Sequence, residues 1–76
     1  MSQSADSAGA IAIAINGEPR RVPAGGTVLD LLANLGIEAG RVAVELNREI
    51  VRRQAWAETP VEDGDAVEIV HFVGGG

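Results

Sequence analysis

One strongly marked helix signal constrains the fold of this chain more than any other feature. Four apolar residues recur at the spacing i, i+3, i+4 and i+7, on one face of a helix: Val28, Leu31, Leu32 and Leu35. Thr27 precedes them and Asp30 follows three residues later, which is a short form of the capping box. Gly36 stands where a left-handed C-cap belongs, and Ile37 is placed to fold back onto Leu32. The sequence predicts one short helix with a single buried face.

Alternating residues before this helix predict a β-hairpin. Isoleucine alternates with alanine over residues 11–15, which predicts a strand with its isoleucines on the buried face. Asn16-Gly17 favours the positive φ angles of a tight turn, so residues 18–22 should form the returning strand. Pro19 has no N–H for the ladder, so this second strand should lie at a sheet edge or start beyond the proline.

Three further strands are expected after the helix. Residues 42–46 alternate, with Val42, Val44 and Leu46 expected on the core face. Asn47-Arg48 can make a turn, and residues 49–51 form a short return. Residues 52–58 fit either an irregular loop or a single helical turn anchored by Trp56. A turn cluster at 62–65 precedes the last strand. In that strand Val67 and Ile69 should face inward, and His71 follows them on the same face. The opposite face carries Glu68, Val70 and Phe72.

This order of elements predicts an α+β fold in which a mixed sheet packs on one main helix, the β-grasp arrangement found in ubiquitin-like proteins. Residues 1–9 are small and polar and are expected to be a disordered lead-in. Residues 10–73 should form the domain, and residues 74–76 a flexible, reactive glycine tail.

Composition excludes several classes of function. The 76 residues include no cysteine, which excludes a disulfide framework and a cysteine nucleophile. The formal net charge is −5, so nucleic acid and anionic membranes are not expected partners. With no apolar run long enough to span a bilayer and no signal-peptide pattern, the expected location is the cytoplasm.

No residue pattern typical of an enzyme or a metal centre is present. His71 is the single histidine, and a lone histidine on a strand is usually structural. The acidic residues of 62–65 lack the spacing of a calcium loop and fit a turn. Gly25-Gly26-Thr27 lacks the lysine of a phosphate-binding loop and fits a turn followed by an N-cap. We therefore expect no catalytic residue, no metal and no bound cofactor.

The C-terminal glycines are the strongest candidate for chemistry. An apolar strand runs into Gly74, Gly75 and Gly76. A chain end that must enter an enclosed active site has to be thin and extended, and glycine is the most permissive residue for this. A frayed end would have the same composition, so the residues alone leave both interpretations open.

Residues 11–76 resemble the sulfur carrier proteins of thiazole formation in thiamine biosynthesis, the ThiS family. The most specific part of the resemblance is a spaced set of residues together with the glycine end: Asn47, Ile50, Val51, Arg53 and Trp56. The chain departs from the family at Arg52, where proline is usual, and in having three terminal glycines where two suffice.

The resemblance implies a function without a catalytic residue in this chain. A ubiquitin-activating-like adenylyltransferase would adenylate Gly76 with ATP, and a sulfur donor protein would supply the sulfur of a C-terminal thiocarboxylate. Thiazole synthase would then receive that sulfur. Gly74 and Gly75 would give the carboxylate access to the active sites of these partners.

Three alternatives remain at this point. The small subunit of molybdopterin synthase usually has prolines just before its glycine pair, and residues 71–73 contain none. A conjugating ubiquitin-like modifier is the second alternative. The third is a passive binding module, which would lose no function on removal of Gly76.

Val70 and Phe72 are the predicted partner interface. They alternate with the inward residues of the last strand, so they should point to solvent just before the reactive tail. Two large apolar side chains on an outer sheet face are typical of a docking patch. The competing expectation is that a loop or the lead-in covers them, or that Phe72 turns inward.

Overall fold

A computed structural model describes residues 9–72 of the chain, so predictions for residues 1–8 and 73–76 lie outside the described residues. Its elements follow in the predicted order, with two 3₁₀ helices added: β1 (Ala10–Ile15), β2 (Glu18–Pro23), α2 (Val28–Asn34), η1 (Ala39–Arg41), β3 (Val42–Leu46), β4 (Glu49–Val51), η2 (Arg53–Glu58) and β5 (Ala66–His71). The helices within residues 9–72 lack the length and apolar character that crossing a bilayer requires.

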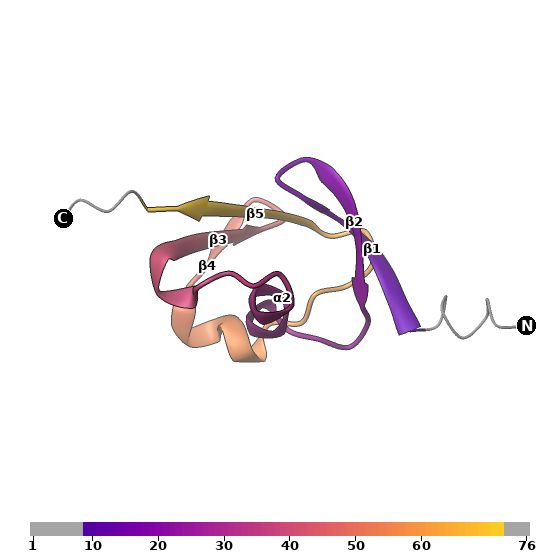
Figure 1. Cartoon of the computed structure of the whole chain (residues 1–76), viewed down its shortest axis with the longest axis horizontal. Coiled ribbons are helices and arrows are strands. Elements are labelled where there is room, and N and C mark those ends of the chain that lie inside the picture. Colours follow the sequence, from indigo (N-terminus) through magenta and orange to yellow (C-terminus); the bar gives the residue numbers. More distant parts are fainter. Residues whose placement is uncertain (1–8, 73–76) are drawn as a thin grey trace, which may run out of the picture.

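The five strands form one mixed sheet with the order β2-β1-β5-β3-β4. β5 lies in the middle, parallel to β1 and antiparallel to β3. α2 and η2 lie on one side of this sheet (Figure 1). The predicted β-grasp arrangement is confirmed, and β2, which contains Pro19, is an edge strand as expected.

Both hairpin turns use positive φ angles at their two central residues. Asn16 and Gly17 have φ of 51° and 84°, which confirms the predicted turn. Asn47 and Arg48 have φ of 51° and 72° at the second turn. Two positive values at the central positions match the twist of the flanking strands, and arginine adopts such a value only at a cost.

The ends of α2 follow the sequence signals. The Thr27 N–H donates to Oδ2 of Asp30 at 2.9 Å, and the Asp30 N–H donates to Oγ1 of Thr27 at 3.3 Å, which completes the capping box. At the other end the N–H of Ile37 donates to the Leu32 carbonyl at 3.0 Å, with Gly36 at a φ of 73°. This pattern is the Schellman motif, so the predicted C-cap is also confirmed.

The core lies between α2, η2 and the inner face of the sheet. Its buried members are Ile13, Val22, Val28, Leu31, Leu32, Val42, Val44, Trp56, Val61, Val67 and Ile69. Ile11, Ile15, Leu35 and Leu46, which were also predicted for the core, are half-buried and pack against it. Val22 and Val61 were not predicted for the core, because no periodic pattern marks them.

Trp56 determines the structure of the segment that the sequence left ambiguous. Its side chain is 2% exposed, and its indole N–H donates to the Val51 carbonyl at 2.8 Å. The surrounding residues form the 3₁₀ helix η2, closer to the predicted helical turn than to an irregular loop.

Candidate functional site

The C-terminal end of β5 carries the candidate site, because the predicted reactive tail follows it. β5 alternates as predicted, with Val67 and Ile69 buried and Val70 exposed. The N–H of Phe72 donates to the Arg41 carbonyl at 2.9 Å, which continues the pairing with the β3 side past the end of the strand. The chain is therefore held to the sheet up to Phe72.

The face of the sheet that α2 does not cover is called here the outer sheet face. Val70 and Phe72 lie on it and are 57% and 58% exposed. Among residues 9–72 no loop covers them and Phe72 does not turn inward, so their predicted exposure is confirmed. Their role as an interface stays a prediction.

Two further apolar residues that the sequence did not suggest lie on the outer sheet face. Ala43 is half-buried and lies opposite Val70 in the register of β3 and β5. Ile50 of β4 is 75% exposed and lies opposite Glu45, on the same face. The period of two in residues 49–51 could have identified Ile50, since its neighbour Val51 packs on the core.

The acidic cluster at 62–65 acts as a turn. Oδ1 of Asp63 accepts from the Ala12 N–H at 2.8 Å. Asp65 accepts from the Glu62 N–H at 2.7 Å through Oδ2, and from the Asn47 amide at 3.0 Å through Oδ1. Gly64 has a φ of 88°. Over residues 9–72 no three histidine, aspartate or glutamate side chains gather into a group that could hold a metal ion.

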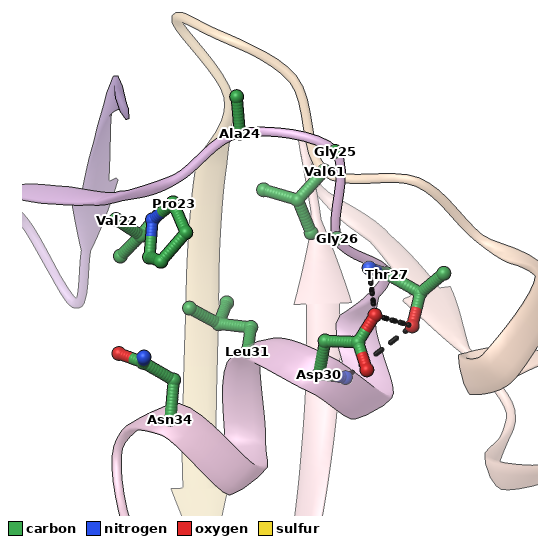
Figure 2. Close-up of a pocket in the computed structure, with 10 residues that line it drawn as sticks. All are labelled: Val22, Pro23, Ala24, Gly25, Gly26, Thr27, Asp30, Leu31, Asn34 and Val61. Atoms are coloured by element: carbon green, nitrogen blue, oxygen red, sulfur yellow. Dashed lines mark hydrogen bonds between the residues drawn. The ribbon is translucent and has the colours of Figure 1, made fainter. Parts of the chain in front are cut away.

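The glycine-rich segment before α2 lines a pocket beneath the β2–α2 loop (Figure 2). Figure 2 shows the Asp30 carboxylate turned back to Thr27, where it occupies the N-terminus of the helix. A negative charge at this position disfavours a phosphate, so the turn and N-cap interpretation is confirmed. His71, also considered above, is exposed at the end of β5.

The predicted reactive residues Gly74, Gly75 and Gly76 lie outside the described residues. What the structure supplies is the position from which they start. The middle strand of the sheet ends at His71, and the exposed Phe72 follows it beside Val70. The structure thus brings the predicted interface to the base of the tail.

Comparison with known proteins gives consistent matches. A model of the ThiS family matches residues 11–76. The sulfur carrier protein ThiS of Bacillus subtilis is 49% identical over 51 residues, which cover 67% of this chain and 77% of that protein. The crystal structure of thiamine biosynthesis protein ThiS from Geobacter metallireducens has a TM-score of 0.76 and 42% identity, over 87% of this chain and 100% of that one.

A thiazole synthase of Paramagnetospirillum magneticum is 50% identical over 64 residues, which cover 84% of this chain. The chain spans only 20% of the length of that protein, so the match is to one part of a longer chain. The family model covers nearly all of the folded residues, and the solved structure has the same fold. This chain belongs to the ThiS family.

Proposed function

We propose that this chain is a sulfur carrier for thiazole formation in thiamine biosynthesis, and that its working group is the C-terminal carboxylate of Gly76. Membership of the ThiS family supports this function. The observation that carries it is the position of β5. This middle strand of the sheet ends two residues before the three glycines, and the chain is held by backbone pairing up to Phe72.

The proposed chemistry has two steps. A carboxylate is a poor electrophile, so the Gly76 carboxylate first attacks the α-phosphorus of ATP, forming an acyl-adenylate and releasing pyrophosphate. A sulfur nucleophile at the oxidation level of sulfide then attacks the carbonyl carbon and displaces AMP. The product is a thiocarboxylate, whose sulfur is nucleophilic and passes to thiazole synthase.

This chain acts in the scheme as a co-substrate, and its partners supply the catalysis. A ubiquitin-activating-like adenylyltransferase binds ATP, and a sulfur donor protein provides the sulfur. We place the protein in the cytoplasm, where ATP is available to the activating enzyme. Residues 10–73 form the domain that the partner proteins recognise, and residues 74–76 enter the active sites of those partners.

Val70 and Phe72 align the tail with these active sites. They lie on the outer sheet face with more than half of each side chain exposed. Apolar side chains of this size contribute most to binding when a partner covers them completely. Their position immediately before residues 73–76 means that docking here fixes the starting point of the tail.

Intact-mass measurement after reaction tests the proposal. The full chain is incubated with ATP, the adenylyltransferase of the same organism and sulfide, and should gain the mass difference between sulfur and oxygen. Fragmentation should place this change at Gly76. A variant that lacks Gly76 is the control and should stay unmodified. A mass change on an internal residue, or none, contradicts the proposal.

A further inference from the structure

β5 uses its two edges differently along its length. Toward β3, every second residue of β5 uses its backbone N–H and carbonyl for pairing. The last of these bonds runs from the Phe72 N–H to the Arg41 carbonyl at 2.9 Å. Toward β1, the intervening residues pair: the carbonyl of Asp65 accepts from Ala14 at 3.0 Å, and that of Val67 accepts from Asn16 at 2.8 Å. By this alternation the backbone groups of Ile69 and His71 also face the β1 side.

The pairing on the β1 side stops before the end of β5. β1 pairs with β5 only from Ala14 to Ile15 and then turns away into the hairpin. The side chain of Asn16 replaces the missing strand for one residue, because its amide bonds both the N–H and the carbonyl of Ile69. Figure 1 shows β5 continuing past the hairpin turn with β3 beside it.

His71 is the next residue on this edge. Within residues 9–72 no hydrogen-bond partner for its backbone N–H or carbonyl is present on the β1 side. An unpaired strand edge of this kind is a template for a strand from another protein. Only Phe72 and Val73 separate this edge from the glycine tail in the sequence.

A hollow of about 350 Å³ borders the same edge. Its lining is mixed, and most of its accessible surface is polar. Ile15, Leu35, Ile37 and Ile69 contribute apolar groups, and Asn16, Arg20, Asn34 and His71 contribute polar ones. An incoming strand would direct alternate side chains into this hollow. An acidic side chain complements Arg20 in this mainly polar hollow, in a chain whose net charge is otherwise negative.

We propose that thiazole synthase adds an extended strand to β5 at His71, with an acidic side chain directed into the hollow toward Arg20. This inference rests on the proposed function, which makes the synthase the acceptor of the sulfur. In the Paramagnetospirillum magneticum relative, a segment similar to this chain is part of the thiazole synthase chain itself, which favours the synthase as the occupant.

Strand addition explains how the tail is presented. In the complex, a partner strand bound at His71 fixes the end of β5 close to the point where the glycine tail begins. Glycine has no side chain to hinder a close approach by the partner backbone. Pairing at His71 thus positions the chain from which the reactive end extends.

Amide hydrogen exchange of the full chain, followed residue by residue by NMR, tests this directly. In the free protein the His71 amide should exchange quickly, whereas the Phe72 amide is already protected by Arg41. Adding the full thiazole synthase of the same organism should slow exchange at His71 by about fivefold or more, since one new hydrogen bond contributes about 1 kcal/mol. Unchanged exchange at His71 in a saturated complex overturns the proposal.

Two matched pairs of variants measure the same contact through affinity. His71→Pro removes the N–H that faces the open edge and leaves the bonds to β3 in place, so we expect about fivefold weaker binding of the synthase. His71→Ala keeps the N–H and should bind within about threefold of wild type. Arg20→Glu should weaken binding at least about fivefold, whereas the neighbouring Arg21→Glu, on the other face of β2, should change it little.

The outcomes separate this inference from the proposed function. If the thiocarboxylate forms normally and His71→Pro and Arg20→Glu both bind like wild type, strand addition is wrong and the sulfur carrier function stands. If His71 becomes protected in the chain alone as its concentration rises, a second copy occupies the edge and the proposal is wrong. If the wild-type chain does not bind the synthase at all, both the inference and the proposed acceptor are wrong.

Discussion

The side chain of Asn16 pairs with the backbone of Ile69 as a strand would. Its Oδ1 accepts from the Ile69 N–H at 2.8 Å, and its Nδ2 donates to the Ile69 carbonyl at 3.2 Å. The two residues are 53 positions apart in the chain. This pair joins the first hairpin to the middle strand, so it should contribute to stability.

Asn16→Gly should therefore destabilise the fold by about 1–3 kcal/mol, because both bonds to Ile69 are lost while the positive φ is still allowed. Asn16→Ala should lose about 1 kcal/mol more, since alanine resists that φ. Urea unfolding followed by circular dichroism measures both values. A glycine variant as stable as wild type would show that these two bonds make no net contribution.

Arg48→Gly should stabilise the protein. Arg48 has a φ of 72°, which glycine adopts without the steric cost that an arginine side chain imposes. The expected gain is about 0.5–1 kcal/mol in the free energy of unfolding, because the greater freedom of glycine in the unfolded chain offsets part of the relief. Arg48→Ala is the control: it removes the same side chain and should give no gain.

Leu32→Ala should cost about 2–5 kcal/mol, because Leu32 is 1% exposed in the centre of the core. Leu29→Ala provides the comparison within the same helix, since Leu29 is 42% exposed and its removal should cost less than about 1 kcal/mol. Thermal and urea unfolding of both variants check the assignment. Similar losses in the two variants would contradict the buried face described for α2.

Phe72→Ala should weaken binding to the adenylyltransferase by about 1–3 kcal/mol with little change in stability, because the side chain is exposed on the outer sheet face. Titration calorimetry measures the affinity, and the melting temperature checks the fold. Leu29→Ala, on the helix side of the molecule, should bind normally. Normal affinity in a destabilised Phe72 variant would assign this residue to the structure rather than to recognition.

Gly75→Val should leave the fold intact and block adenylation of Gly76. The change lies beyond Phe72, the last residue whose backbone bond to the sheet is described, so stability should not depend on it. A β-branched side chain restricts φ and widens the chain, which hinders entry into a narrow active site. Pyrophosphate release in the presence of ATP and the adenylyltransferase gives the rate. An unchanged rate would show that the tail does not need to be thin.

Local signals predicted much of this fold because their causes are local. The Thr27 capping box and the Asn16-Gly17 turn each depend on residues within a few positions of one another. The alternation in β5 likewise identified the exposure of Val70 and Phe72. These features needed no knowledge of the tertiary structure.

The features that the sequence did not reveal depend on distant partners. The bonds from Asn16 to Ile69, and from the Ala66 N–H to Oδ1 of Asn47 at 2.9 Å, join positions that no periodic pattern connects. Val61 is buried because the Val61 N–H donates to the Gly26 carbonyl at 3.0 Å and holds a loop against the helix end. The unpaired edge at His71 followed only from the register of β1 against β5.

The middle position of β5 has a consequence for how the molecule assembles. Without β5 the two hairpins, β1–β2 and β3–β4, share no hydrogen-bonded edge, and an isolated two-stranded hairpin is marginally stable in water. β1 pairs with a strand that follows it by about fifty residues, so folding depends on a contact of high sequence separation. Folding should therefore be cooperative and comparatively slow. A chain shortened before residue 66 would lack Val67 and Ile69 in the core and would not fold stably. The folded population therefore consists of molecules that still carry the strand leading to the reactive end.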